Sequence, residues 1–262
     1  MTTMAPNLEV VDVNKTFGGV RALSDVNLQV SGAGITALIG PNGAGKTTLF
    51  NVVSGFGLPY TGRVRFGGRD LTGLAPHEVA RAGIVRTFQT TVGFPSMTVA
   101  ENVAIAVAGS DLDTPWSAFL RWGQDRRVRA EAHRVSLEKL DAAGIAGLAD
   151  TFLADLSPGN SKLVEIVRQL ALKPQMLLLD EPAAAMAVDQ IDVLSGIIRQ
   201  IAADGVGVLV IDHNLGFVLE LAQTVHVLES GAIMASGTPD EIGKDERVRE
   251  IYLGGAEDNH VA

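Results

Sequence analysis

The chain has 262 residues, of which 47% are hydrophobic and 19% are charged, a composition typical of a globular protein and unlike that of a disordered or collagen-like one. Lys and Arg total 21 against 30 Asp and Glu, and the formal net charge of −9 has the wrong sign for a domain that coats nucleic acid. The absence of cysteine excludes disulfide frameworks, cysteine-ligated zinc, iron–sulfur clusters and thiol nucleophiles. We therefore expect no nucleic-acid partner.

Membrane and export signals are also missing from the sequence. The first residues, MTTMAPNLEVVDVNK, carry neither a basic start nor an apolar stretch of signal-peptide length. The longest apolar runs, such as Val206–Ile211, are far shorter than the roughly 20 residues that span a bilayer. We expect a chain that is not exported and does not itself cross a membrane.

Four short segments near the start of the chain predict strands. Leu8–Val13, Val26–Val30 and Arg63–Phe66 alternate and are bounded by Gly, Asn or Asp, which is typical of a partly antiparallel sheet. Ile35–Ile39 differs because it reads as a continuous apolar run. Such a run favours a central strand that is covered on both faces.

A helical region follows. Val99–Ala108 and Ala130–Ala143 have helical patterns, and we expect an inserted helical subdomain over residues 91–159. The stretch between these helices holds four basic residues, Arg121, Arg126, Arg127 and Arg129. We interpret them as a solvated helix face, and a position near anionic lipid head groups is the alternative.

Two later apolar runs, Met176–Leu179 and Val206–Ile211, predict central strands that lie beside Ile35–Ile39. A hairpin-like turn is expected at Glu229–Gly231. In Gly237–Glu241, Thr is placed as an N-cap, Pro at the first helical position and Glu three residues after Thr, which predicts a capping box and a short C-terminal helix.

A phosphate-loop pattern, GPNGAGKT, lies between the strand Ile35–Ile39 and the helical segment Thr48–Ser54. Its glycines let backbone N–H groups curl around a phosphate chain, and the helix N-terminus adds partial positive charge. Lys46 supplies a mobile cation, and Thr47 is expected to place its hydroxyl on Mg²⁺. The predicted phosphate-binding residues are Gly40, Asn42, Gly43, Ala44, Gly45, Lys46, Thr47 and Thr48.

Polar side chains follow the later apolar runs. Asp180 and Glu181 are adjacent carboxylates at a strand end, so Asp180 can hold the metal while Glu181 faces a water beside the γ-phosphate. His213 should emerge at the same sheet edge as Asp180 and Lys46, where it would contact the γ-phosphate or, in the plainer alternative, only cap the chain. Gln89 can ligate Mg²⁺ and orient water, although a single Gln is uninformative by itself.

In this order, these motifs resemble those of the ATPase subunits of ATP-binding-cassette transporters, and the resemblance covers essentially the whole chain. Four stretches are most similar to ATPases of branched-chain amino acid importers, with lipopolysaccharide-export ATPases second: Thr16–Leu23, Val85–Gln89, Asp180–Ala184 and Ile251–Gly254.

The resemblance implies an α/β architecture. The expected fold is a P-loop NTPase core with a parallel sheet, an N-terminal antiparallel β-subdomain and an inserted helical subdomain. One ABC ATPase domain, 1–262, would comprise a nucleotide-binding core with the β-subdomain over 1–90 and 160–236, a helical subdomain over 91–159 and a C-terminal helical tail over 237–262.

Roles for single residues also come from the resemblance. It assigns Phe17 to stacking on the adenine of ATP, an aromatic that would otherwise be read as ordinary core. It assigns Gln89 to the loop that senses the membrane subunit and His213 to the switch histidine. The implied catalytic set is Lys46, Gln89, Glu181 and His213, with Mg²⁺ held by Thr47, Gln89 and Asp180.

The family's signature segment, Leu-Ser-Gly-Gly-Gln, is altered here to LSPGN over Leu156–Asn160. Ser157 and Gly159 keep their phosphate-facing chemistry, and the final Asn is one methylene shorter than Gln. Pro158 loses a backbone N–H but suits the first turn of a helix. Ser161, Lys162 and Leu163 follow, where basic or Gln residues are usual in the family.

Family ATPases work as head-to-tail dimers in which the phosphate loop of one subunit faces the signature of the other. Ala187 stands where Asp, or Asn in the importer branch, usually makes a cross-dimer hydrogen bond. Because the catalytic set is complete while the signature is altered, we expect a heterodimer with unequal sites. Implied partners are a different ATPase subunit, transmembrane permease subunits and, indirectly, a periplasmic or extracellular solute-binding protein, at the cytoplasmic face of the cell membrane.

The expected function is ATP hydrolysis that powers transport of a hydrophobic or branched-chain amino acid or a similar small solute. A soluble cassette ATPase for repair, translation or cofactor assembly is one alternative, but it would usually bring a coiled-coil insertion, duplicated cassettes or a basic nucleic-acid face. A weakly hydrolysing regulatory subunit is another, which Pro158, Asn160 and Ala187 favour and Glu181 and His213 oppose.

Overall fold

The computed structural model describes residues 6–87, 93–109 and 126–254. An antiparallel sheet has the strand order β2-β1-β4-β5. Its strands are β1 (Leu8–Phe17), β2 (Val20–Val30), β4 (Thr61–Phe66) and β5 (Arg69–Asp70). The predicted N-terminal sheet is confirmed, and β1 and β2 run further than expected, to a tight turn at residues 18 and 19.

The second sheet is mostly parallel and has the order β10-β9-β3-β8-β7-β6. The strands β9, β3, β8, β7 and β6 pair in parallel, and β10 closes one edge as an antiparallel hairpin with β9. The three continuous apolar runs lie side by side as predicted, with β8 between β3 and β7. The strands are β3 (Ile35–Ile39), β6 (Ile84–Arg86), β7 (Met176–Asp180), β8 (Gly207–Ile211), β9 (Thr224–Glu229) and β10 (Ala232–Gly237).

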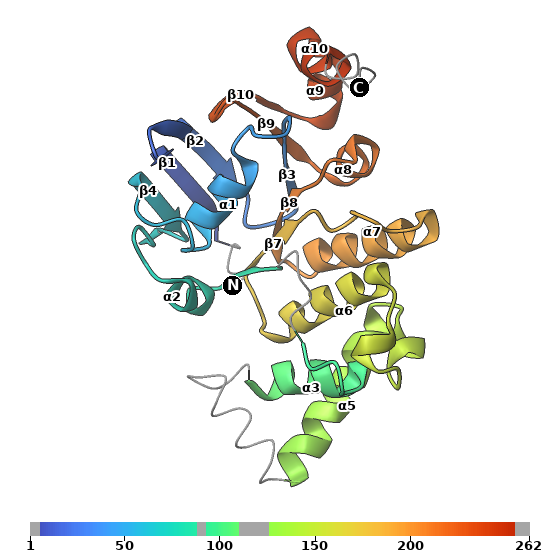
Figure 1. Ribbon diagram of the computed structural model, residues 1–262. Helices are drawn as coiled ribbons and strands as arrows, with labels where there is room; N and C mark the ends of the chain where they lie inside the picture. The colour runs from blue at the N-terminus through green and yellow to red at the C-terminus, as the bar shows by residue number, and fades with distance from the viewer. Residues whose placement is uncertain (1–5, 88–92, 110–125, 255–262) are drawn as a thin grey trace.

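Successive side chains of a strand point to opposite faces, and here both faces of the parallel sheet are covered. In β7, Leu177 and Leu179 belong to a hydrophobic cluster with the helices of one face. Met176 and Leu178 belong to a second cluster, which includes α1 (Lys46–Val53) and the antiparallel sheet. In Figure 1, α1 lies between the two sheets. This two-sided burial explains why the central strands are apolar at every position.

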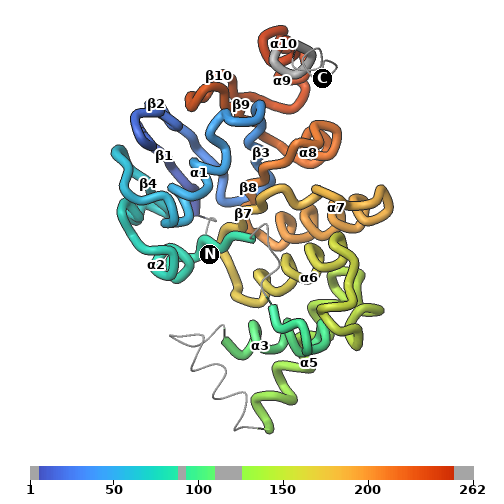
Figure 2. Tube along the Cα trace, viewed as in Figure 1, coloured from blue at the N-terminus to red at the C-terminus, as the bar shows by residue number. Residues whose placement is uncertain are grey.

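The remaining helices include two pairs that lie at opposite ends of the molecule. Figures 1 and 2 show α3 and α5 at one end of the molecule and α9 and α10 at the other. The predicted helices at 99–108 and 130–143 are confirmed, although α5 begins four residues earlier than expected. The helices are α2 (Pro76–Arg81), α3 (Val99–Gly109), α5 (Arg126–Ala142), α6 (Pro158–Ala171), α7 (Val188–Ala203), α8 (Leu215–Leu221), α9 (Pro239–Lys244) and α10 (Glu246–Gly254).

The helices α6 and α9 each begin with a side-chain cap, of which the cap of α9 was predicted and the cap of α6 by Ser157 was not. The hydroxyl of Ser157 caps α6 by accepting from the Asn160 amide, and Pro158 takes the first helical position. Thr238 and Glu241 form the capping box of α9, because each side chain accepts from the other residue's amide. Within the described ranges, no helix has the length and apolar character needed to cross a membrane.

Candidate functional site

The phosphate-loop segment turns tightly between β3 and α1. Gly45 caps α1 with φ of +105°, in the left-handed region that favours glycine. A Cβ atom at Gly45 would lie 2.6 Å from the carbonyl oxygen of Ala22, and one at Gly40 would lie 2.0 Å from that of Leu228. The loop is therefore packed against the backbones of β2 and β9, and these two positions have no room for a side chain.

Lys46 begins α1 and is almost fully buried. Its Nζ donates to the carbonyl oxygens of Gly40 and Pro41, at 2.7 and 2.9 Å. Burial lowers the pKa of the ammonium below its usual value of 10.5, while the negative charges of Glu181 and Asp180 act in the opposite direction. The cation is thus held within the loop, close to two carboxylates.

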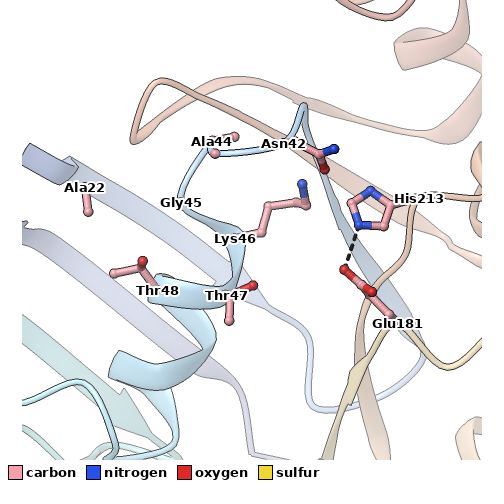
Figure 3. A pocket seen from close by; sticks show the side chains of 10 residues that line it. Ala22, Asn42, Ala44, Gly45, Lys46, Thr47, Thr48, Glu181 and His213 are labelled. Atoms are coloured by element: carbon pink, nitrogen blue, oxygen red, sulfur yellow. Dashed lines mark hydrogen bonds and ion pairs between the residues drawn. The ribbon is translucent and has the colours of Figure 1, made fainter. Parts of the chain in front are cut away.

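Glu181 and His213 face Lys46 across a pocket. Nε2 of His213 lies 2.6 Å from Oε1 of Glu181, which is hydrogen-bond distance. Figure 3 shows Lys46 on one side of a shared space and Glu181 and His213 on the other. The pocket has a volume of about 210 Å³ and is lined by Ala22, Asn42, Gly43, Ala44, Gly45, Lys46, Thr47, Thr48, Glu181 and His213.

The parallel sheet explains why these residues meet. Lys46, Glu181 and His213 follow β3, β7 and β8, which are adjacent strands, so their carboxyl ends open at one edge of the sheet. The structure therefore brings seven of the eight predicted phosphate-loop residues into the pocket lining, all but the buried Gly40, together with the predicted Glu181 and His213.

Asp180 ends β7 and is not among the residues that line the pocket, and its side chain is 1% exposed. Its Oδ2 accepts from Nη2 of Arg86 at 2.7 Å, and Nη1 of Arg86 donates to Oδ1 of Asn51 on α1 at 2.6 Å. Oδ1 of Asp180 is buried and has no hydrogen-bond partner in the described part of the chain. Sequence reasoning missed Arg86, because a contact between side chains of β6 and β7 leaves no local pattern.

A strained turn carries Glu181. The residue has φ of +49°, which is uncommon for a residue with a Cβ atom. Its amide donates to the carbonyl oxygen of Ile211 at 2.8 Å, and Oδ2 of Asp212 accepts from the amide of Ala183 at 2.9 Å. Asp212 was also missed as a site residue, although its place at the end of β8 was a usable signal.

Phe17 lies at the end of β1, outside the residues that line the pocket, and is 54% exposed. Nζ of the buried Lys15 lies 4.6 Å from the centroid of the Phe17 ring and donates to the carbonyl oxygen of Pro59 at 2.7 Å. A cation therefore sits against the ring while much of the side chain stays accessible. Gln89 lies outside the described residues.

The signature segment also lies away from the pocket lining, at the start of α6. A Cβ atom at Gly159 would lie 2.2 Å from Oε1 of Gln190 on α7. Nε2 of Gln190 donates to Oδ1 of Asn160 at 2.9 Å. The side chain of Asn160, which is one methylene shorter than the family's Gln, therefore has a hydrogen-bond partner within its own chain.

The chemistry of the site suits a divalent cation that takes most of its ligands from phosphate and water. Among the described residues, no three His, Asp or Glu gather as a complete metal site. Mg²⁺ is commonly held by one or two carboxylates together with substrate phosphates. The unpartnered Oδ1 of Asp180 and the hydroxyl of Thr47 in the pocket fit that donor set.

Comparison with known proteins gives consistent matches. Residues 23–184 match the family described as ABC transporter, and residues 232–258 match the family described as branched-chain amino acid ATP-binding cassette transporter. The chain is 36% identical over 253 residues to the high-affinity branched-chain amino acid transport ATP-binding protein BraF of Pseudomonas aeruginosa, covering 96% of this chain and 99% of that protein.

It is 34% identical over 252 residues to the corresponding protein LivG of Escherichia coli, with 96% and 99% coverage. Among solved structures, the ADP conformation of an ATP-binding cassette of an ABC transporter has a TM-score of 0.81 and 34% identity, covering 97% of this chain and all of that one.

Proposed function

The chain belongs to the ATPase subunits of ATP-binding-cassette transporters, and on that premise we propose that it hydrolyses ATP to power import of a branched-chain or similar hydrophobic amino acid. The names of the similar proteins and the match of residues 232–258 support this solute class. The observation that carries the enzymatic part is the pocket in which Lys46 faces Glu181 and His213.

ATP would lie with its phosphates in the phosphate loop. The backbone amides of Asn42 to Thr48 and the ammonium of Lys46 are suited to the triphosphate, because the turn and the N-terminus of α1 concentrate positive potential there. Phe17 would stack on the adenine. Ser157 and Gly159 would face the γ-phosphate of a nucleotide held by the partner subunit.

Mg²⁺ would be held by the hydroxyl of Thr47 and, through Oδ1, by Asp180, with Gln89 as a further predicted ligand. When bound, the ion neutralises charge on the β- and γ-phosphate oxygens. Arg86 restricts Asp180 to one orientation, because it occupies Oδ2 and leaves Oδ1 for the cation side.

The reaction we propose is attack of water on the γ-phosphorus, with ADP as the leaving group. Glu181 would orient that water or take its proton, and His213 holds the carboxylate at hydrogen-bond distance. Lys46 would stabilise the negative charge that spreads over the phosphoryl oxygens in a loose transition state.

The test is Glu181→Gln in the full chain. Removing a general base is expected to lower ATP hydrolysis about 10²- to 10⁴-fold while ATP binding is retained. Glu220→Gln is the matched control, because it removes only an exposed ion pair with Arg199. Phosphate release by Glu181→Gln near the wild-type rate would show that another group is the base.

Coupling to permease subunits at the cytoplasmic face of the membrane is the second part of the proposal. Two exposed aromatic side chains, Phe94 and Phe152, lie near the start of α3, where Thr98 and Phe152 form an antiparallel bridge. These side chains and the segment Phe94–Val103 form the surface we propose for the permease, and Gln89, outside the described residues, is a further predicted contact. Co-purification from native membranes followed by mass spectrometry would identify the partner and its stoichiometry.

We also propose that the working dimer is a heterodimer with unequal sites, because Pro158, Asn160 and Ala187 depart from the family pattern while Glu181 and His213 do not. Nucleotide trapping in the assembled complex should then find one site that turns over ATP more slowly. Purified chain that dimerises with ATP and hydrolyses it at the rate of symmetric importers would contradict this. Failure to hydrolyse ATP in any assembly would favour a regulatory subunit.

A further inference from the structure

The turn between β7 and α7 is fastened to α6 at both of its ends. At the start of the turn, Nζ of Lys162 on α6 donates to the carbonyl oxygens of Glu181 and Ala184, each at 2.8 Å. At the end of the turn, Gln190 accepts from the amide of Ala187 at 3.2 Å and donates to Asn160 on α6. The turn and α6 are therefore joined by side-chain contacts that span 19 to 30 residues of sequence.

This turn needs outside support. Glu181 has φ of +49° and Ala185 has φ of +61°, and neither is a glycine. A strained backbone persists only where the surroundings hold it, and a carbonyl oxygen that points at a fixed ammonium has a defined direction. Because the carbonyl and the side chain of Glu181 share one Cα atom, fixing the carbonyl restricts where the carboxylate lies.

The charge on Lys162 is suited to this task. Burial lowers the pKa of its ammonium, and four acidic groups oppose that change: Asp212, Glu181, Glu165 and Asp180. Removing the ammonium would leave two carbonyl oxygens of the turn without their charged donor. The amides of Glu181 and Ala183 would keep their bonds to Ile211 and Asp212, but no charged donor would then fix the direction of the Glu181 carbonyl.

We propose that Lys162 is a positioning residue that fixes the main chain of Glu181 and thereby aims its carboxylate at the pocket. This rests on the proposed role of Glu181 as the base. Ser157 caps α6 and Gly159 lies in its first turn, so the signature segment and Lys162 share one helix. The ammonium thereby joins the segment that would face the partner's nucleotide to the main chain of Glu181, which would serve the chain's own nucleotide.

The experiment compares Lys162→Met, Lys162→Arg and Glu181→Gln in the complex of the full chain with its native membrane subunits. Lys162→Met is expected to lower kcat roughly 10- to 100-fold, because a small misplacement of a reacting group has effects of that order. The Kd for ATP should stay within about threefold, because the phosphate loop is untouched. The ATP-bound dimer should accumulate, as expected for Glu181→Gln.

Lys162→Arg should restore most of kcat, since a guanidinium also offers several donors to the two carbonyls. The matched control is Lys139→Met, which removes another half-buried lysine whose pKa burial lowers, on α5 and outside the pocket lining. It should leave kcat unchanged. If circular dichroism shows that Lys162→Met is unfolded, Lys162→Gln, which keeps one donor group, is measured in its place.

Wild-type kcat in Lys162→Met would overturn the proposal, as would a loss of ATP affinity that matches the loss of kcat. Equal losses in Lys162→Met and Lys162→Arg with a lowered melting temperature would show a structural role only. Hydrolysis that persists in Glu181→Gln would instead refute the proposed base, so the two failures are distinguishable.

Discussion

At the scale of single residues, Phe17 offers a ring that is already held in place. The buried ammonium of Lys15 lies against the ring, and the carbonyl oxygen of Pro59 anchors that ammonium. A ring fixed in this way loses little conformational freedom when a base stacks on it, which favours binding.

Phe17→Ala is therefore expected to weaken ATP binding. A stacked base contributes about 1–3 kcal/mol, which corresponds to roughly 5- to 150-fold in Kd. Isothermal titration calorimetry with ATP measures the change, and inorganic triphosphate is the control ligand because it has no base. Phe17→Trp should keep the affinity for ATP.

An equal loss of affinity for ATP and for triphosphate would show that Phe17 supports the phosphate loop and not the adenine. Unchanged affinity for both would place the adenine elsewhere.

The sequence predicted the groups that line the pocket but not the groups that hold them. Lys46, Glu181 and His213 could be placed because each follows an apolar run, and the carboxyl ends of parallel strands share one edge. Arg86 and Lys162 act on residues 94 and 19 positions away, through contacts that no local spacing encodes. Such long-range pairs need the packed structure.

At the scale of elements, α7 begins without a side-chain cap. Ala187 is the N-cap residue, with φ of −74° and ψ of 161°, and has no side-chain acceptor for the free amides of the first turn. The oxygen of Gln190 reaches back to the Ala187 amide, which is half of a capping box.

Ala187→Asp should therefore raise the free energy of unfolding by about 0.5–2 kcal/mol, because the carboxylate would accept from the first-turn amides and complement the helix dipole. Urea denaturation followed by circular dichroism measures this. Ala203→Asp, the same exchange at the other end of α7, is the control and should not stabilise the chain. Equal gains in both variants would rule out capping as the cause.

His226 joins the two sheets at β9. Its Nε2 lies 3.1 Å from the carbonyl oxygen of Gln29 on β2, and its Nδ1 lies 2.7 Å from Oγ of Ser236 on β10. Burial lowers its pKa below 6.5, and the contact with Gln29 opposes the change. The folded protein therefore favours the neutral ring.

As the pH falls through 6.5, the imidazole of His226 takes up a proton in the unfolded chain before it does so in the folded one. The contribution of His226 to the free energy of unfolding is therefore present above that pH and is lost as the pH falls below it. One such group changes the free energy of unfolding by at most about 1.4 kcal/mol per pH unit. His226→Gln should reduce the loss of stability between about pH 7.5 and about pH 5.5, measured by urea denaturation. An identical pH dependence in both proteins would contradict the assignment.

Element prediction succeeded for the continuous apolar strands and for the two helices of the inserted region. The central strands and α3 and α5 were predicted, and β3 matches to the residue. The long helix α7 was not predicted, although its buried side chains recur with helical spacing. The short elements β6, α2 and α8 were also missed, because none of them has a continuous apolar run or a full helical repeat. Their positions are set by tertiary packing and not by local propensity.

At the scale of the whole molecule, the pocket lies at the carboxyl ends of β3, β7 and β8. The two hydrophobic clusters lie on opposite faces of the sheet that these strands form. One cluster contains Ala44 of the phosphate loop and residues of α1, and the other contains residues of α6 and α7 together with Ala183, two residues after Glu181. A nucleotide in the pocket would therefore lie between the phosphate loop on one side and the turn that carries Glu181 on the other.

The most direct test is a crystal structure of the Glu181→Gln chain with ATP and Mg²⁺. We predict β- and γ-phosphate oxygens at about 2.7–3.2 Å from amide nitrogens of residues 42–48 and from Nζ of Lys46, with Thr47 and Asp180 on the side of the metal and the side chain at position 181 facing the γ-phosphate. ATP bound at another surface, or Asp180 and position 181 turned away from the phosphates, would contradict the account.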